Sequence, residues 1–333
     1  MVHHRSRGRD ILTVLFSVAA ATLQPGLCAA AEGDAARVEL RQDDEAGRIE
    51  IVIDGKMAVL YRYGAGVDLP YYVLYSPSGK PMTIEHPEKY PHHRSVWFAD
   101  KVQLEGKRVV GFYNALYSRI DKDDPQSPFR DYIRHVEFAP ERVEGDRATT
   151  GAKLAWVMDE NVPVLDETRS MRIVALEGGE YLLDITFTVT ANHGDVTFKS
   201  DATHYAWPYV RMTPEFSVES GGKMVNSEGG VNQKGTHGQV ATWVDHSNTI
   251  DGAAEGLAVF SHTDNEHPHR WLTRDYGTFG PRRIDAKSGK EFTLRKGESM
   301  SQRVGILVHR GDAEGAKVGE RYEQYVKTQE GQQ

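Results

Sequence analysis

The feature that most constrains this chain is a series of segments between positions 132 and 199 in which apolar and polar residues alternate. Successive side chains of a strand point to opposite faces, so a period of two predicts strands with one buried face. The predicted strands cover residues 132–139, 147–159, 164–176, 180–191 and 195–199. Turns rich in glycine, asparagine and aspartate separate them. No βαβ alternation is present, which disfavours Rossmann and TIM-barrel architectures.

The flanking segments extend this pattern. Residues 37–60 predict a strand pair with a turn at Asp54-Gly55. Further strands are predicted at residues 239–245, 255–262, 291–294 and 300–309. Residues 312–327 predict an amphipathic helix with Asp312 as its N-cap. We therefore expect an all-β protein: one large antiparallel β-sandwich with a C-terminal helix, formed as a single domain by residues 32–333.

The first 31 residues have the composition of a secretion signal. Three arginines precede an apolar run at residues 11–23, which is too short to span a bilayer comfortably. Three alanines at residues 29–31 supply a small-residue cleavage pattern just before Glu32. Alternatives are an uncleaved N-terminal anchor and a lipoprotein processed at Cys28. We expect a periplasmic or secreted protein with residues 1–31 as its signal peptide.

Composition narrows the possible chemistry. Cys28 is the only cysteine and lies inside the predicted signal, so the mature chain is expected to lack disulfides, cysteine nucleophiles and thiolate metal sites. Loss of the three signal arginines and Asp10 removes a net charge of +2 and changes the formal charge from −8 to about −10. The charges are interspersed, so we predict neither nucleic acid nor, after signal cleavage, a membrane as partner. No pattern specifies an oligomeric state or a cofactor.

Two segments concentrate the side chains that can titrate, ligate or stack. The first cluster, residues 85–100 (EHPEKYPHHRSVWFAD), combines three histidines with an arginine and a tryptophan. The second cluster, residues 264–276 (DNEHPHRWLTRDY), repeats this set with two histidines around a proline, followed by Arg-Trp. We predict that the fold brings both clusters into one site.

These histidines could ligate a metal, since imidazole is a common ligand of zinc, copper and iron. Ligand pairs such as HExxH are absent, however, and the adjacent His92 and His93 would point to opposite faces of an extended segment. We therefore assign no residue as a metal ligand. Structural roles, in loop hydrogen bonds for the histidines and in core packing for the tryptophans, also account for any one of these side chains taken singly.

Acid–base chemistry on a sugar fits the same residues, because histidine titrates near neutrality and can share a proton transfer with a carboxylate. Arginines can hold a carboxylate or hydroxyls by forked hydrogen bonds, and aromatic rings can stack on a sugar. The candidate catalytic residues are His93, His204, Glu228 and Asp275, with Asp264 as a further carboxylate. The candidate substrate-binding residues are His86, His92, Arg94, Trp97, His269, Arg270, Trp271, Arg274 and Tyr276.

The sequence gives no support to one class of hydrolase and leaves another open. No GxSxG motif is present, so serine hydrolase chemistry has no support. A glycosidase mechanism with two carboxylates stays open, because those carboxylates need no fixed spacing in the sequence.

Several motifs between residues 69 and 325 resemble the bacterial PmoA-like family, whose members carry the label "methane oxygenase PmoA". They are PYYVLYSPSGKP, HP followed by HHRSVWFA, NSEGG, WVDHS, GLAVFSH, HPHRW, RDYGTFG and RVGILVHRGD. The resemblance implies a β-sandwich akin to the galactose-mutarotase supersandwich, for a family of uncharacterised function. The positions that match its motifs are His86, His92, His93, Arg94, Trp97, Glu228, His262, His269, Arg270, Trp271, Arg274 and Asp275.

The leading hypothesis is an exported carbohydrate-active protein that performs acid–base chemistry on a sugar or sugar derivative, as a lyase, hydrolase or epimerase. The alternatives are a non-catalytic carbohydrate-binding protein and, as the family label suggests, a histidine-ligated metal-dependent oxygenase. In the first two cases the partner is a carbohydrate or a sugar-derived small molecule.

Overall fold

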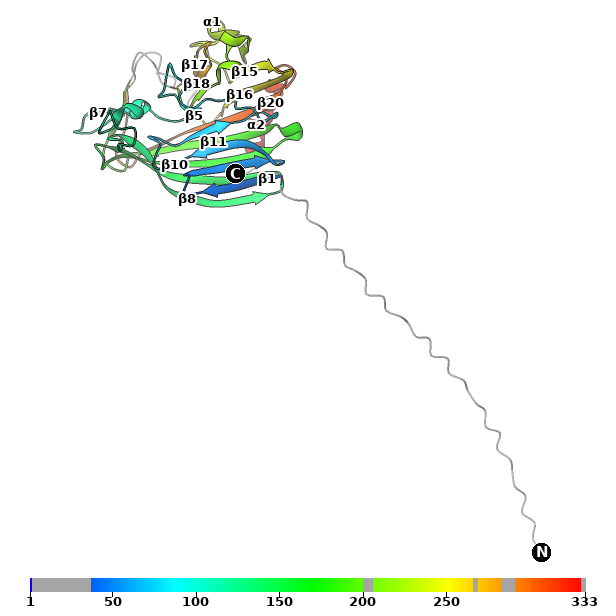
Figure 1. Cartoon of the computed structure of the whole chain (residues 1–333), viewed down its shortest axis with the longest axis horizontal. Helices are drawn as coiled ribbons and strands as arrows, with labels where there is room; N and C mark the ends of the chain where they lie inside the picture. Colours follow the sequence, from blue (N-terminus) through cyan, green and yellow to red (C-terminus); the bar gives the residue numbers. More distant parts are fainter. Residues whose placement is uncertain (2–36, 200–205, 266–268, 283–290, 331–333) are drawn as a thin grey trace. The chain divides into compact units, whose positions relative to one another are not determined.

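The computed structural model describes residue 1 and residues 37–199, 206–265, 269–282 and 291–330. The predicted signal peptide, His204 and His267 lie outside the described residues. Residues 36–333 form one compact unit. Its strands form three sheets, and neighbouring strands in each of them are antiparallel (Figure 1).

Sheet 1 contains eight strands in the order β1-β2-β3-β4-β5-β13-β18-β17. Their bounds are β1 (Val38–Asp43), β2 (Arg48–Ile53), β3 (Lys56–Arg62), β4 (Tyr71–Leu74), β5 (Val96–Trp97), β13 (Tyr209–Arg211), β18 (Thr278–Arg282) and β17 (Arg270–Thr273). The predicted turn at Asp54-Gly55 is confirmed, and both residues have the positive φ that such a hairpin turn requires. The segment predicted as a strand pair forms three strands, because residues 44–47 make an additional turn.

Sheet 2 contains eight strands in the order β14-β15-β16-β20-β11-β10-β9-β8. Their bounds are β14 (Lys223–Asn226), β15 (Trp243–Ile250), β16 (Ala253–Ser261), β20 (Ser299–Arg310), β11 (Tyr181–Thr190), β10 (Val162–Ala175), β9 (Arg147–Met158) and β8 (Tyr132–Glu144). The prediction of strands in this region is confirmed. β15 begins later than predicted, because residues 239 and 241 pair with the second cluster instead, through the Gln239 carbonyl and the Ala241 amide.

A smaller sheet has the order β19-β12-β6-β7. Its strands are β19 (Phe292–Leu294), β12 (Val196–Phe198), β6 (Lys101–Leu104) and β7 (Val109–Gly111). Short 3₁₀ turns occupy Phe112–Ser118, Glu177–Gly179, Pro214–Phe216 and Val218–Ser220. A five-residue helix, α1 (Asn232–Thr236), follows β14.

Sheets 1 and 2 pack face to face around one apolar core. Tyr181 of β11 crosses between them and donates its hydroxyl to the Ala58 carbonyl of β3 at 2.8 Å. Rings also meet across the core, with His246 of β15 4.6 Å from Phe279 of β18 between ring centroids. Close packing of two antiparallel sheets defines a β-sandwich, so the predicted fold class is confirmed.

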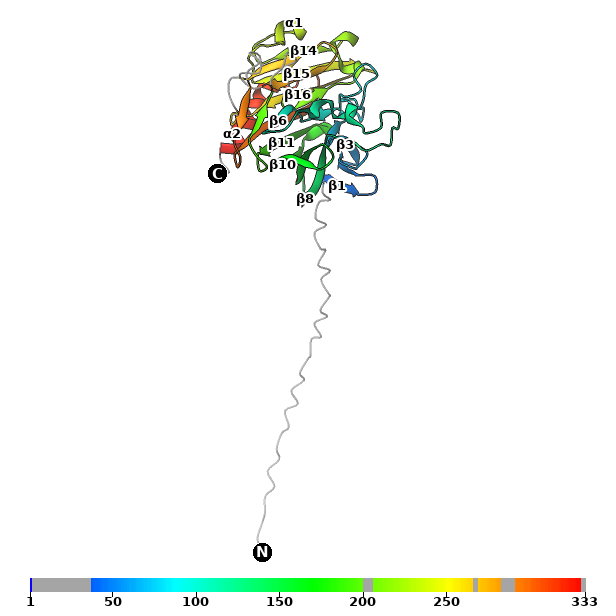
Figure 2. The same cartoon turned by 90° about the vertical axis from the view of Figure 1, so that its left-hand side faces the viewer.

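The C-terminal helix α2 (Val318–Glu330) covers the outer face of sheet 2 and is visible beside β16 in Figure 2. Its Tyr322 and Tyr325 pack on Phe260 of β16, each at 5.7 Å between ring centroids. The predicted start at Asp312 is wrong. The Asp312 side chain accepts the Gly315 amide within a preceding turn, so it caps that turn and not the helix. No helix in the described ranges has both the length and the apolar character needed to cross a membrane.

Gly280 allows β18 to approach the segment that leads into β13. A Cβ atom at this position would lie 2.1 Å from the Pro208 carbonyl oxygen and 2.9 Å from the Ala206 side chain. Both contacts are shorter than van der Waals packing allows, so any larger residue here would force these strands apart.

We predict that Gly280→Ala lowers the free energy of unfolding by at least about 1–3 kcal/mol, as overpacking of a tight core does. Denaturant unfolding measures the change. Gly66→Ala is the matched control, because no atom lies within 4 Å of its added Cβ, and its effect should stay below about 1 kcal/mol. Equal stability of the two variants would contradict the close approach at β18.

Candidate functional site

Strand β13 lies between the strands that carry the two sequence clusters. Tyr209 of β13 pairs with Trp97 of the first cluster, and Arg211 pairs with Thr278 of β18. β18 in turn pairs with β17, whose residues belong to the second cluster. Because side chains alternate along a strand, Trp97, Tyr209 and Arg211 share the face of sheet 1 that points away from sheet 2. The clusters therefore meet across β13 on this outer face.

The first cluster folds back over this face as a loop. The His93 amide donates to the Tyr90 carbonyl, and the His86 amide donates to the His93 carbonyl. His86 has the uncommon positive φ of 50° that this reversal requires. As a result the His93 ring lies between the Tyr90 ring, at 5.0 Å, and the Trp97 ring, at 5.5 Å between centroids.

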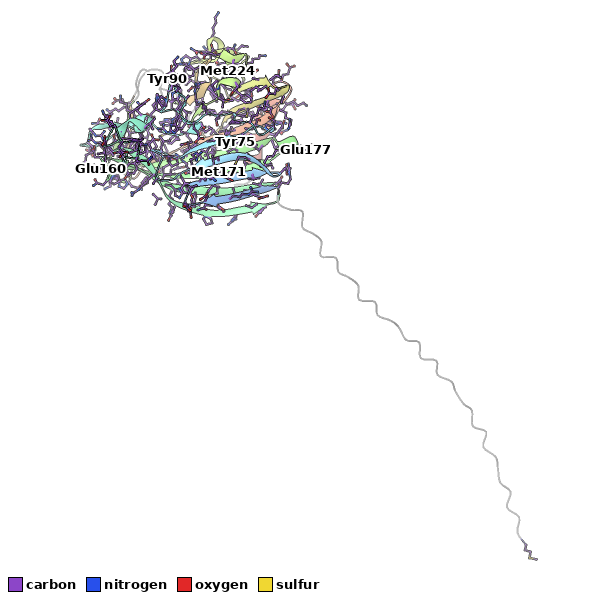
Figure 3. All side chains as sticks on the ribbon, viewed as in Figure 1. Tyr75, Tyr90, Glu160, Met171, Glu177 and Met224 are labelled. Atoms are coloured by element: carbon purple, nitrogen blue, oxygen red, sulfur yellow. The ribbon has the colours of Figure 1, made fainter. Side chains whose placement is uncertain are left out.

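Aromatic rings from four segments gather around His93. We call this set the aromatic cluster: Tyr90, His92, His93, Trp97, Tyr113, Tyr209 and Tyr276. Tyr276, from the second cluster, lies 5.2 Å from Tyr90 and 6.5 Å from His93 between ring centroids. Tyr90 is labelled in Figure 3 and marks the position of the aromatic cluster.

Burial divides the aromatic cluster into a floor and a rim. Trp97 and Tyr209 are stacked at 4.8 Å and are fully buried, so they form the floor. Around the floor, the half-buried side chains of the rim keep part of their surface open to a ligand. These side chains are Tyr90, His92, Tyr113 and Tyr276.

His93 is neutral at the centre of this arrangement. Only 3% of its surface is exposed, and its Nε2 is hydrogen-bonded to the Tyr113 hydroxyl at 3.0 Å. Burial lowers the pKa of His93 to about 3, and electrostatic interactions with His92, Arg211 and Arg94 contribute in the same direction. Burial also lowers the pKa of His92 to about 4, with a contribution from Arg94. The Nδ1 atom of His93 is buried and has no hydrogen-bond partner among the described residues.

Arg211 is a site residue that the sequence analysis did not single out. Its guanidinium lies over the Tyr276 ring at 4.7 Å from the centroid. Burial lowers the pKa of Arg211, and the rings of Tyr276, Tyr90 and Tyr113 are near enough to influence it. The available signal was the spacing of Tyr209 and Arg211, which places both side chains on one face of a strand.

Arg94, which the sequence analysis predicts to bind substrate, lies inside the fold in the structure. It is fully buried and pairs with Asp68 through two guanidinium nitrogens, with Nε 2.8 Å from Oδ1. Its Nη1 also donates to the His92 carbonyl. Because the Arg94–Asp68 pair anchors the loop that carries His92 and His93, Arg94 helps to position the aromatic cluster.

Three other predicted binding residues are also buried in the fold. Trp271 is fully buried and donates its Nε1–H to the Ala241 carbonyl at 2.9 Å. His269 is buried and hydrogen-bonded to the Ser261 hydroxyl. Trp97 lies beneath the rings of the rim. The structure therefore places these three predicted binding residues in the packed interior.

The remaining candidates bind other parts of the chain. Arg270 donates to the Gly238 carbonyl, and Arg274 is hydrogen-bonded to His237. Asp275 accepts the Gln233 amide of α1 at 2.8 Å. These contacts attach the second cluster to the segment around α1.

Two candidates lie on exposed loops. Glu228 is exposed and accepts a hydrogen bond from Ser227. His86 is exposed and bonded to the Pro91 carbonyl. Among the predicted site residues, the structure thus brings His92, His93, Trp97 and Tyr276 together. The residues that the sequence analysis missed are Tyr90, Tyr113, Tyr209 and Arg211.

The described residues contain no group of three or more histidine, cysteine, aspartate or glutamate side chains that could hold a metal ion. His204 and His267 are not among these residues.

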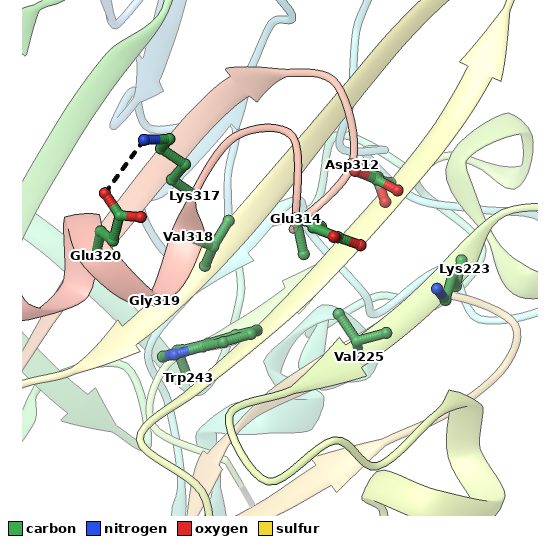
Figure 4. A pocket seen from close by; sticks show the side chains of 11 residues that line it. Lys223, Val225, Trp243, Asp312, Glu314, Lys317, Val318, Gly319 and Glu320 are labelled. Carbon is green, nitrogen blue, oxygen red and sulfur yellow. Dashed lines mark ion pairs between the residues drawn. The ribbon is translucent and has the colours of Figure 1, made fainter.

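A cavity of about 410 Å³ lies elsewhere, where β14 and β15 meet the start of α2 (Figure 4). Its walls carry Trp243 and charges of both signs, and Lys317 is paired with Glu320 at 3.5 Å. The mixture of charges gives the cavity no clear preference for a ligand, and none of its wall residues belongs to the aromatic cluster.

The fold and the aromatic cluster define a β-sandwich protein that carries histidine, tyrosine and arginine side chains together on the outer face of sheet 1. The chain belongs to a family of unknown function, DUF6807, whose family model matches residues 48–323. No curated protein matches the sequence.

Solved structures give remote likenesses. The GH36 α-galactosidase AgaB from Geobacillus stearothermophilus matches with a TM-score of 0.40 and 10% identity, over 84% of this chain and 42% of that one. The galactose 1-epimerase from Lactobacillus acidophilus NCFM matches with a TM-score of 0.38 and 10% identity, over 83% of this chain and 100% of that one. A putative aldose 1-epimerase from Escherichia coli K12 matches with a TM-score of 0.32 and 11% identity, over 82% and 99%. The chain spans about two fifths of the α-galactosidase. Likenesses at this level carry no argument about function.

We predict that Arg94→Met lowers the free energy of unfolding by about 3–5 kcal/mol, because it leaves the Asp68 carboxylate buried without a partner. Denaturant unfolding measures the change. Arg41→Met, which breaks an exposed pair with Glu39, should cost at most about 1 kcal/mol. A neutral effect of Arg94→Met would show that the pair does not hold the loop.

We predict that the His93 ring in the folded protein does not titrate between about pH 5 and 8. The folded pKa, about 3, lies below the unfolded value near 6.5, so protonation favours the unfolded chain. The stability from this group is complete above about pH 6.5 and is lost progressively as the pH falls towards 3. NMR of the ring carbons measures the titration, and the protein in denaturant is the control. A folded-state midpoint near neutrality would refute the assignment.

Proposed function

We propose that this protein binds a carbohydrate or a sugar derivative at the aromatic cluster. The observation that carries the proposal is the half-buried rim of Tyr90, His92, Tyr113 and Tyr276 around a neutral His93. Aromatic rings offer apolar faces to the C–H groups of a sugar, and tyrosine hydroxyls can donate and accept hydrogen bonds. The rigid floor of Trp97 and Tyr209 fixes the rim in place, which lowers the entropic cost of binding.

The polar groups of the site suit a ligand with many hydroxyls. A neutral imidazole has one donor and one acceptor, and His93 already engages one nitrogen with Tyr113. Arg211 adds donors at the Tyr276 ring, 4.7 Å from its centroid. The apolar faces of a sugar could therefore stack on the rings of the rim, and its hydroxyls could form hydrogen bonds with the polar groups. Export of the protein, predicted from residues 1–31, would place it where polysaccharides and their fragments occur.

A second candidate is an enzyme that performs acid–base chemistry at the same site, as a lyase, hydrolase or epimerase. The hydrogen bond between His93 and Tyr113 favours it, because it orients the imidazole inside the aromatic cluster. With a pKa of about 3, His93 is a weak base at neutral pH. If the protein is an enzyme, the neutral His93 donates a hydrogen bond to a substrate oxygen, and another group accepts the proton that leaves the substrate. Asp275, which directly precedes Tyr276 of the rim, is the proposed source of that group, together with His204 from the sequence analysis.

A metal-dependent oxygenase, the activity that the PmoA label suggests, has no support from the described residues. The proposed function therefore includes no metal-dependent step. The assignment of the chain to the PmoA-like family itself rests on the motifs in the sequence alone.

We predict that Tyr276→Ala and Tyr90→Ala each weaken binding of a cognate oligosaccharide about two- to tenfold, the effect of losing one aromatic contact. A screen of oligosaccharides by calorimetry identifies the ligand and measures the change. Tyr132→Ala, which removes a half-buried tyrosine at the start of β8, is the control and should bind as the wild type does. Binding that survives both substitutions unchanged would place the sugar site elsewhere.

A further inference from the structure

Two arginines of sheet 1 are buried without a counter-ion among the described residues. Arg211 is 6% exposed and Arg282 is 2% exposed. The Nε and Nη1 atoms of Arg211 and the Nε atom of Arg282 are buried and make no hydrogen bond. Within the described ranges, neither guanidinium has a carboxylate oxygen within 4.0 Å; Glu219 is near enough to influence Arg211, but it forms no ion pair with it.

In the part of the chain that the structure describes, the other arginines that are buried to this degree are compensated. Arg94, at 0% exposure, is paired with Asp68, and Arg169, at 1%, is paired with Glu167. The fold therefore supplies a carboxylate in each case where the arginine holds the structure together. The lack of one at Arg211 and Arg282 sets these two side chains apart.

An uncompensated guanidinium is unfavourable inside a protein. Removing a charge from water costs free energy that only a nearby opposite charge or good hydrogen bonds can offset. The same cause lowers the pKa of Arg282 to about 10, and it lowers the pKa of Arg211. A bound ligand with the opposite charge would offset this desolvation cost. Such a ligand therefore accounts for an uncompensated charge in a candidate site.

Both arginines lie on the face of sheet 1 that carries the aromatic cluster. Arg211 follows Tyr209 by two residues on β13, so the two side chains point to the same side. Thr278, the partner of Arg211 across the strands, and Arg282 are four residues apart on β18, so they also share that side. Tyr209 is near enough to Arg282 to influence its charge. The positive charges therefore flank the floor of the aromatic cluster.

We propose that the ligand of the aromatic cluster is an acidic saccharide whose carboxylate or sulfate group pairs with Arg211, with Arg282 as a second positive charge along the same face. This inference rests on the proposed carbohydrate function and specifies its substrate class. A guanidinium presents two parallel N–H donors that match the two oxygens of such an anion. The rings of Tyr276 and Tyr90 stack on the sugar that carries it.

The experiment compares matched saccharides by calorimetry: trigalacturonate, its methyl ester, a sulfated galactan oligosaccharide and neutral galactotriose. We expect one of the two acidic probes to bind at least roughly tenfold more tightly than its uncharged counterpart, with an affinity that falls as salt rises. Comparison of the carboxylated and sulfated probes identifies the anion. Arg211→Met should remove this preference, and Arg41→Met, an exposed control, should keep it.

Stability supplies a second readout. Because it removes an uncompensated buried charge, Arg211→Met should unfold at the same or a higher temperature than the wild type. The acidic probe should raise the melting temperature of the wild type and leave that of Arg211→Met unchanged. Arg211→Lys keeps the charge without the fork, so it should retain salt-dependent binding at reduced affinity.

Three other outcomes would overturn the acidic-ligand inference. If the acidic and neutral saccharides bind equally well to the wild type, the acidic-ligand inference fails and the carbohydrate function stands. If no saccharide of either kind binds, both fail. A marked destabilisation of Arg211→Met, or its failure to fold, would show that Arg211 serves the structure and would also overturn the inference.

Discussion

The pairing of β13 with β5 on one side and β18 on the other is the constraint on which the candidate site depends. These short strands join segments that lie far apart in the chain, and Tyr209 and Arg211 between them complete the outer face. The close approach at Gly280 and the buried pair of Arg94 with Asp68 hold this junction from its two sides. Without them the rings that surround His93 would have no fixed floor.

Electrostatics gives the junction its chemical character. The protein pairs its structural arginines with carboxylates, as at Arg94 and Arg169, and leaves Arg211 and Arg282 with a desolvation cost. The same desolvation keeps His93 neutral at physiological pH. The proposed recognition of an anionic sugar rests on partly open rings beside positive charges that have no ion pair within the described residues. The low pKa of His93 makes it a weak general base.

Much of the fold could be predicted from alternation, because a period of two depends only on local side-chain direction and burial. The candidate site could be predicted less well. His93-Arg94 and Arg270-Trp271 look equally reactive in the sequence, yet Arg94 and Trp271 are buried and bonded to the fold. Tyr276 and Arg211 carry weaker local signals, and they reach the site only because β18 and β13 place them there. Asp312 similarly has the residue type of a helix cap but serves a neighbouring turn.

The sequence by itself determined the all-β class, the Asp54-Gly55 hairpin and the two segments richest in functional groups. These properties follow from local periodicity, turn chemistry and motif spacing. Only the tertiary structure decided which side chains gather on the outer face of sheet 1, because that depends on long-range strand pairing and on which charges find a partner. The difference between a compensated Arg94 and an uncompensated Arg211 exists only once Asp68 lies beside one of them and Tyr276 beside the other.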